Sequence, residues 1–364
     1  MYRSTRRKVE YLDESTIAIE GGLNPLSNTL YVGESGLATR LFTPIASLNR
    51  TPITIQGEGT LLYRPMTMMV DPLRQLGVTV RDGGGFLPIE VQGPIHGGEI
   101  CVDGSISSQF ITGLLLALPL AEEDTTLHVD SPVSTPYIDM TIDTARRFGI
   151  EIMHNEGDYS EFFIKGGQQY TPTDLAIEGD WSGASTMLVA GAIAGEVTVK
   201  NISTLSKQAD TAICHALERA GAGIIIEQDS ITISKRPLRA FEFDATNSPD
   251  LFPALAALAA AAEGESVIIG TERLRHKESD RAETIRQEYE KLGIEVDISE
   301  DNIMKIRGGK IHPAETFSHD DHRIAMSLAV TALRCRGEIK IENAECVEKS
   351  YPTFFEDLES IILR

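Results

Sequence analysis

The sequence predicts an α/β (α+β) fold built from a repeated unit of helices and strands. Two observations carry this prediction: amphipathic segments that end in a glycine recur at a constant interval, and each unit contains one nearly all-apolar segment. Glycine just past a helix adopts the left-handed conformation that ends it, and a regular period over four copies indicates internal duplication. The closing glycines, each 72 residues after the one before, are Gly77, Gly149, Gly221 and Gly293.

The apolar segment of each unit is predicted to be a helix buried in the core. Each segment is too short to cross a bilayer and too apolar to lie on a surface. The four segments read FITGLLLALPLA (110–121), TMLVAGAIAG (186–195), LFPALAALAAAA (251–262) and IAMSLAVTAL (324–333).

Strands are predicted after each apolar segment and after each closing glycine. The first kind follows the buried helix directly, and the second kind comes as a pair after an amphipathic helix. One unit therefore reads helix, strand, helix, strand, strand. The runs of the first kind are TPITIQG, TTLHVD, EVTVKN, ESVIIG and EIKIEN, and strand pairs lie in GIEIMHNEGDYSEFFIKG and AGIIIEQDSITISK.

The period also gives an expectation for the two ends of the chain. Residues 8–20 read as two short strands with a turn at Asp13-Glu14-Ser15, the pattern that closes a unit. Extending the interval forwards from Gly293 places the next closing glycine just past the last residue. We therefore expect the first unit to lack its front and the last to lack its closing strands. The alternative is an atypical end cap, as in other repeat arrays.

Composition and charge narrow the class of protein. A chain of 364 residues, 41% apolar and 24% charged, has room for two globular domains. The net charge of −21, from 54 acidic and 33 basic residues, argues against nucleic acid as the main partner. The four cysteines have neither CxxC nor metal-ligand spacing, which predicts a cytoplasmic protein. There is neither a signal peptide nor an apolar run long enough for a membrane span.

A polar cluster precedes each buried helix in the same register. Helix N-termini present unpaired N–H groups and a positive dipole end, which suit phosphate or carboxylate. Helix capping by Ser and Asp alone is the alternative. Five such ends on equivalent units favour a shared anion site. The clusters are GESGLATR, GSISSQF, GDWSGAS, TNSPDLF and SHDDHRIAM.

Basic residues gather in the same parts of this acidic chain. Lys277 and Arg281 stand four residues apart, a spacing that is unfavourable for like charges on a helix unless an anion bridges them. These residues predict a ligand with several negative charges. The basic set is Arg40, Arg64, Lys277, Arg281, Arg323 and Lys349.

These segments resemble the 5-enolpyruvylshikimate-3-phosphate synthase family, the 3-phosphoshikimate 1-carboxyvinyltransferases. The matching stretches, in family order, are ESGLATR, YRP, DGSISSQF, STPYID, EGDWSGAS, NSPD, HKESDR, DDHRIAM and EKSYP. The resemblance implies a two-domain inside-out α/β barrel built from repeated βαβαββ units around buried helices. The first domain would span 1–178, with one incomplete and two full repeats. The second would span 179–364, with three repeats, the last lacking its closing strands.

The resemblance also implies an activity. Family members transfer the carboxyvinyl group of phosphoenolpyruvate to the 5-hydroxyl of shikimate 3-phosphate and release phosphate, in the shikimate pathway to chorismate and the aromatic amino acids. No metal and no organic cofactor is implied. The expected partners are the two small-molecule substrates, with neither nucleic acid nor membrane. A monomer is expected, with association through exposed strand edges as the alternative.

The resemblance also implies the site residues, position by position along the matching motifs. Asp250 would be the base for the attacking hydroxyl, Glu278 the proton donor to the methylene carbon, and Lys277 a contact to the substrate hydroxyls. For Asp250 the alternative is a helix cap after Pro249. For His322 it is a packed or capping histidine beside Arg323. Asp321 and Asp180 are expected to support the site rather than to act in catalysis. The phosphoenolpyruvate set is Gly36, Arg40, Arg64, Arg281, Arg323 and Lys349. The shikimate 3-phosphate set is Ser107, Ser108, Gln109, Ser134, Tyr137, Asp250 and Lys277.

The sequence departs from the family pattern at several points. Glu34 and Leu37 stand where the family usually has Asn and Thr, and Arg273 where an Asn is frequent. The family's Gly-Ser-Lys-x-Ser segment has no counterpart. A non-catalytic homologue that binds substrate or a protein partner is therefore an alternative. A UDP-N-acetylglucosamine enolpyruvyl transferase is another, but its loop cysteine is absent from GEGTLLYRP.

Overall fold

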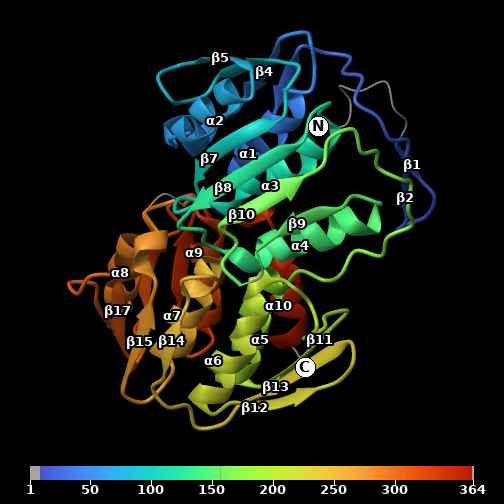
Figure 1. Cartoon of the computed structure of the whole chain (residues 1–364). Helices are drawn as coiled ribbons and strands as arrows, with labels where there is room; N and C mark the ends of the chain where they lie inside the picture. Colours follow the sequence, from blue (N-terminus) through green and yellow to red (C-terminus); the bar gives the residue numbers. More distant parts are fainter. Residues whose placement is uncertain (1–8, 156, 276, 363–364) are drawn as a thin grey trace. The chain divides into compact units, whose positions relative to one another are not determined.

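The protein consists of two compact units, Met1–Leu175 and Ala176–Arg364, each with its own apolar core (Figure 1). The structure is a computed structural model that describes residues 9–155, 157–275 and 277–362.

One sheet pattern occurs three times, twice in the first unit and once in the second. Two parallel strands are followed by an antiparallel hairpin whose second strand pairs with the inner parallel strand. This topology confirms the predicted duplication. The sheets are β3 (Thr29–Tyr31), β4 (Ile53–Gln56), β6 (Ile89–Gln92) and β5 (Thr79–Asp82); β7 (Gly98–Asp103), β8 (Thr125–Asp130), β10 (Glu161–Ile164) and β9 (Ile152–His154); and β14 (Glu242–Asp244), β15 (Glu265–Ile269), β17 (Ile303–Arg307) and β16 (Glu295–Asp297).

Three smaller sheets, within the described residues, contain parts of this pattern. The sheet β11 (Glu196–Lys200), β13 (Ser230–Ser234) and β12 (Gly223–Ile226) holds the hairpin and one further strand. The sheet β18 (Ala314–Phe317) and β19 (Ile339–Glu342) holds only the parallel pair. The hairpin β1 (Val9–Tyr11) and β2 (Ile17–Ile19) closes around residues 12–16 and confirms the strand pair expected there.

The all-apolar segments form buried helices, as predicted. In the second unit α5, α7 and α9 pack against one another, and in the first unit α1 packs against α3. Every residue of α7 is buried, which is why its sequence shows no polar face. The buried helices are α1 (Gly36–Ala46), α3 (Ser108–Ala117), α5 (Trp181–Ala194), α7 (Phe252–Ala260) and α9 (His322–Ala332).

The remaining helices are amphipathic or short. The outer α-helices are α2 (Val70–Gln75), α4 (Thr135–Arg147), α6 (Ile213–Ala220), α8 (Arg281–Lys291) and α10 (Phe354–Ile362). The 3₁₀ helices are η2 (Gly59–Tyr63), η3 (Thr67–Met69), η4 (Leu118–Leu120), η5 (Ala209–Ala212), η6 (Pro249–Leu251), η7 (Thr271–Arg273) and η8 (Ala344–Lys349).

The four periodic glycines end the outer helices in one conformation. Their φ angles are 77° at Gly77, 83° at Gly149, 87° at Gly221 and 81° at Gly293. At each one the glycine N–H donates to the carbonyl three residues back, and the next N–H donates to the carbonyl five residues back, all at 3.0 Å. This paired closure of the last turn requires a left-handed residue.

Two of these glycines allow the backbone cost to be measured separately from a steric clash. At Gly221 an added Cβ would meet nothing closer than 3.5 Å, whereas at Gly293 it would lie 2.6 Å from His312 Cδ2. Gly221→Ala is expected to lower the free energy of unfolding by about 1–2 kcal/mol, the cost of a left-handed L-residue. Gly293→Ala should cost more, and denaturant titration of both variants checks the order. An equal loss of unfolding free energy in both variants would contradict a steric clash at position 293.

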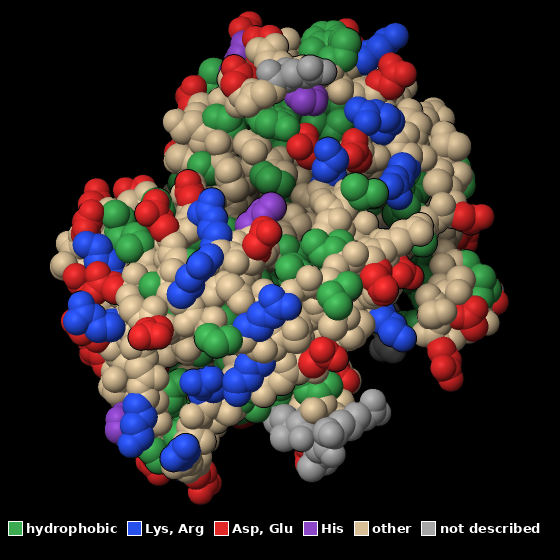
Figure 2. All heavy atoms as spheres, turned by 90° about the horizontal axis from the view of Figure 1, so that it is seen from below, with side chains coloured by type: hydrophobic (Ala, Val, Ile, Leu, Met, Phe, Trp, Pro, Cys, Tyr) green, Lys and Arg blue, Asp and Glu red, His purple; other side chains and the backbone are tan. Residues whose placement is uncertain are grey.

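Among the residues that the structure describes, none of the helices combines the length and apolar character that a membrane span requires. On the face seen in Figure 2, basic and acidic side chains lie intermixed.

Candidate active site

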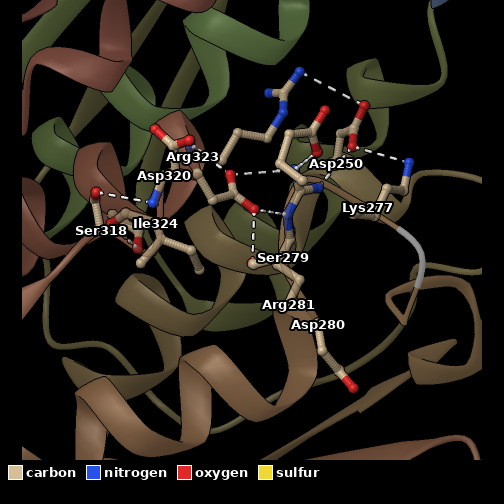
Figure 3. A network of polar contacts seen from close by, with 12 residues as sticks. Asp250, Lys277, Ser279, Asp280, Arg281, Ser318, Asp320, Arg323 and Ile324 are labelled. Carbon is tan, nitrogen blue, oxygen red and sulfur yellow. Dashed lines mark hydrogen bonds and ion pairs between the residues drawn. The ribbon is translucent and has the colours of Figure 1, made fainter. Parts of the chain in front are cut away.

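The side chain of Asp250 lies among three cations in the second unit. Its Oδ1 is 3.2 Å from Lys277 Nζ and 2.8 Å from Arg281 Nη1, and its Oδ2 is 3.6 Å from Arg323 Nη2 (Figure 3). Asp250 lies in η6, Arg323 in the first turn of α9, and the other two cations at or just before the start of α8. The anion expected to bridge Lys277 and Arg281 is therefore, in this structure, the protein's own carboxylate.

Arg281 is fully buried and is held by three carboxylates. Besides the contact with Asp250, its Nη2 donates to Glu278 Oε2 at 2.6 Å and its Nε donates to Asp321 Oδ2 at 2.8 Å. Charge-assisted bonds of this kind fix a guanidinium group in one orientation. In this structure the guanidinium groups of Arg281 and Arg323 thus have acidic neighbours, and only that of Arg281 is completely enclosed.

Asp321 contacts both segments that carry these cations, the start of α8 and the start of α9. Its carboxylate also accepts bonds from Ser279 Oγ at 3.1 Å and from the backbone N–H of Arg323 at 3.0 Å, which caps α9. It is fully buried. Asp321 therefore fixes the start of α9 against the start of α8, a supporting position of the kind expected from the sequence.

The charges of this cluster set its protonation. Burial acts to raise the pKa of Asp250, but Lys277, Arg323 and Arg281 outweigh it and hold that pKa well below the ordinary value. Burial lowers the pKa of Lys277, with Asp250 acting in the opposite direction. Asp250 is consequently an anion at neutral pH and able to accept a proton. Its side chain does not cap η6 or α7, so the helix-cap alternative does not describe it.

Lys349 is anchored to the turn that precedes α9. Its Nζ lies 3.1 Å from Asp320 Oδ1 and 2.9 Å from the carbonyl oxygen of Asp320. Asp320 and His319 both have left-handed φ angles, 60° and 54°. Such non-glycine residues are strained, and they cluster where function requires a fixed geometry. His319 Nε2 is held by buried Glu288 Oε1 at 2.7 Å.

His322, the first residue of α9, is buried and neutral. Burial and, to a smaller extent, the charge of Arg323 lower its pKa to about 4. Its Nδ1 has no hydrogen-bond partner among the described residues.

In the first unit the predicted residues lie mainly at the starts of α1, α3 and α4. Arg40 Nη1 donates to Gln109 Oε1 at 2.9 Å, and the backbone N–H of Gln109 donates to Ser107 Oγ at 3.2 Å, which caps α3. Arg40 and Ser108 are buried. The contact between Arg40 and Gln109 links residues that the sequence assigned to different substrates.

Two further pairs of predicted site residues lie in this unit. The Cβ atom that Gly36 lacks would lie 2.8 Å from Arg64 Nη1, so the absence of a side chain at Gly36 leaves room for this guanidinium group. Ser134 adopts a left-handed conformation with φ 54° before α4, and its carbonyl accepts the Tyr137 N–H at 3.0 Å.

A family model described as EPSP synthase (3-phosphoshikimate 1-carboxyvinyltransferase) matches residues 5–358. The chain belongs to the EPSP synthase family. The 3-phosphoshikimate 1-carboxyvinyltransferase of Clostridium novyi is 35% identical over 357 residues, which cover 96% of this chain and 80% of that protein. That of Methanosarcina acetivorans is 38% identical over 349 residues, covering 94% and 80%.

Two solved structures share the fold. EPSP synthase from Acinetobacter baumannii has a TM-score of 0.81 at 29% identity and covers 99% of this chain and 85% of that one. The enolpyruvyl transferase NikO from Streptomyces tendae, at 20% identity and a TM-score of 0.75, shows the same fold. These likenesses confirm the predicted two-domain α/β architecture.

The EPSP synthase motifs pointed to the residues of the cluster but not to all of their neighbours. The motifs gave no role to Asp320, which holds Lys349, or to Ser279, which binds Asp321. They also gave none to Asp210, a fully buried acid in η5. Its segment, SKQADTA, reads as an ordinary polar helix start, so nothing in the local pattern marks it.

Proposed function

We propose that this chain transfers the carboxyvinyl group of phosphoenolpyruvate to the 5-hydroxyl of shikimate 3-phosphate and releases phosphate. The observation that supports it best is the ionised Asp250 carboxylate among Lys277, Arg281 and Arg323, in the motif positions of the EPSP synthase family. An anionic base surrounded by cations suits a reaction that deprotonates a hydroxyl group beside two polyanionic substrates.

The proposed first step forms a tetrahedral intermediate. Asp250 accepts the proton of the 5-hydroxyl group while the hydroxyl oxygen bonds to C2 of phosphoenolpyruvate. Glu278 gives a proton to C3, which becomes a methyl group. In the second step the methyl group returns a proton to Glu278, the C2–C3 double bond forms again, and the C2–O bond to phosphate breaks. The proton held by Asp250 passes to the departing phosphate. The protons balance, and the products are the enolpyruvyl ether and phosphate.

The neighbouring side chains fit these roles in this proposal. Glu278 is paired with Arg281 at 2.6 Å, which favours its anion, so it takes up a proton before it donates one. A bound anionic substrate beside it would favour that uptake. Lys277, whose pKa is lowered by burial, would contact the hydroxyl groups of shikimate 3-phosphate.

The remaining residues are proposed as substrate ligands. Arginine forks bind carboxylate and phosphate bidentately, and serine hydroxyls at helix starts bind phosphate together with backbone N–H groups. For phosphoenolpyruvate they are Gly36, Arg40, Arg64, Arg281, Arg323 and Lys349. For shikimate 3-phosphate they are Ser107, Ser108, Gln109, Ser134 and Tyr137, with Asp250 and Lys277.

Phosphate release from the two substrates tests the proposal directly. The purified chain should release phosphate only when both are present, and mass spectrometry should show the enolpyruvyl ether. The double variant Lys277→Ala, Arg323→Ala sets the background. A wild-type rate equal to this background would reject the activity and favour a non-catalytic homologue.

Gly36→Ala tests the proposed site of phosphoenolpyruvate. The new methyl group would lie 2.8 Å from Arg64 Nη1 and force the guanidinium group to shift. We expect the KM for phosphoenolpyruvate to rise about tenfold, with the KM for shikimate 3-phosphate nearly unchanged. Steady-state kinetics with each substrate varied in turn measures this. An equal rise in both KM values would argue against Arg64 as a phosphoenolpyruvate ligand.

We further propose that the chain works as a monomer in the cytoplasm. All four cysteines are free thiols, which suits a reducing compartment. Sedimentation of the purified chain tests the oligomeric state.

A further inference from the structure

Asp210 is a fully buried carboxyl group that contacts no cation among the residues that the structure describes. It lies in η5, and its Oδ2 is hydrogen-bonded to Ser182 Oγ in the first turn of α5. Its Oδ1 has no hydrogen-bond partner among the described residues. Buried polar atoms are almost always satisfied, so an exception calls for an explanation.

Other buried acids of this unit are neutralised by cations. Asp321 meets Arg281, and Glu288 meets Lys291 Nζ at 2.8 Å. In the described part of the chain Asp210 forms no ion pair. A buried charge without a partner is costly, and replacing it by an apolar residue would remove that cost. Asp210 is therefore poorly explained by packing alone.

The packing places Asp210 within electrostatic reach of the catalytic cluster. Helix α5 packs against η5, against η6, which carries Asp250, and against α9, which carries Arg323. Burial, the largest cause, and the charge of Asp250 act to raise the pKa of Asp210, which comes to about 6. Arg323 and the Ser182 hydrogen bond lower that pKa, and Asp180 at the N-cap of α5 raises it.

The interaction between two charges is mutual, so ionised Asp210 also raises the pKa of Asp250. The cations around Asp250 act in the opposite direction: Lys277, Arg323 and Arg281 lower its pKa, and Arg273 also interacts with it. A carboxylate whose pKa is held very low is a weak base, which slows proton abstraction.

We propose that Asp210 is a positioning residue of the transfer reaction: as an anion it offsets part of the positive charge around Asp250 and makes Asp250 a stronger base toward the attacking hydroxyl group. This inference rests on the proposed function, because it uses the proton-accepting role of Asp250. Protonation of Asp210 removes its negative charge and with it this strengthening of Asp250 as a base. Asp250 itself stays ionised at that pH, so the rate falls to a lower level without being abolished.

Asp210→Asn removes the charge and keeps the size of the side chain. The ratio of kcat of the wild type to kcat of the variant should be about 1 near pH 5. It should rise about 3–10-fold by about pH 8, with its midpoint near the pKa of Asp210, about 6. Titration of the substrates affects both proteins equally and leaves the ratio unchanged. A ratio that stays constant over this range would mean that Asp210 acts only structurally, and it would overturn the proposal.

Ser182→Ala is the matched control, because it keeps the charge of Asp210 and removes only its hydrogen bond. That bond lowers the pKa of Asp210, so its loss should move the midpoint of the wild-type pH dependence to higher pH. A variant that instead lost the pH dependence altogether, as Asp210→Asn does, would show that the hydrogen bond and not the charge carries the effect.

Thermal unfolding tests the coupling without turnover. A raised pKa means that the native state binds more protons than the unfolded state, so this group lowers stability as pH rises from about 4 to about 6. The Tm of the wild type should therefore fall relative to Asp210→Asn across that window. In an Asp250→Asn background the window should end at lower pH, because Asp250 no longer raises the pKa.

These measurements distinguish a failure of the proposed function from a failure of the proposed role of Asp210. An inactive wild type that still shows both Tm shifts would reject the proposed function and keep the coupling. An active wild type whose Tm window is unchanged by Asp250→Asn would overturn the role of Asp210 and keep the function.

Discussion

Asp250→Asn is expected to lower kcat about a thousandfold while the chain stays folded. The amide cannot accept the proton of the attacking hydroxyl group, although it fits the same space. The KM for phosphoenolpyruvate should not rise, because Lys277, Arg281 and Arg323 lose a competing anion. Steady-state kinetics and circular dichroism measure the two parts of this expectation.

Asp280→Asn is the matched control for this substitution. Asp280 caps α8 through the N–H of Glu283, and its side chain points away from the Asp250 cluster in Figure 3. Asparagine caps helices as well as aspartate does, so kcat should stay within about twofold. A loss of kcat in Asp250→Asn of less than about tenfold would exclude Asp250 as the general base.

Asp321→Asn is expected to lower the free energy of unfolding by about 3–5 kcal/mol, the usual cost of breaking a buried ion pair. Both Asp321 and Arg281 are fully buried, and they are joined at 2.8 Å. Asparagine can still cap α9, so the loss reports the missing charge rather than the missing cap. Denaturant titration at neutral pH measures it.

An exposed ion pair provides the comparison. Glu283 and Arg286 on α8 are joined at 2.5 Å, and both side chains are about one-third exposed. Glu283→Gln should cost at most about 1 kcal/mol, because surface pairs contribute little. If the two substitutions cost the same, the burial of Arg281 is not what makes its ion pair important.

Helices and their ends were predictable from the sequence because their signals are local. The all-apolar segments and the periodic glycines depend on residues within one turn or one helix, and the structure has buried helices and positive φ angles at these places. Two strands that precede buried helices, β3 and β14, left no such signal. They have three residues each, too few to show an alternation, and only the family resemblance implied them.

The candidate site was predictable in its members but not in its contacts. Motif positions named Asp250, Lys277 and Arg281, and the spacing of the two cations predicted a bridging anion. That this anion is Asp250, with Asp321 behind Arg281, depends on how η6, α8 and α9 meet in space. These residues lie far apart in the sequence, so no short-range pattern predicts their contacts.

The sequence by itself determined the duplicated α/β unit and the buried helices, and it predicted which residue types would face an anionic ligand, because periodicity and capping act over a few residues. Only the tertiary structure decided which charges neutralise one another and which, like that of Asp210, are buried without a cation. Those outcomes depend on distances between segments far apart in the chain, and electrostatic energies change with both distance and burial.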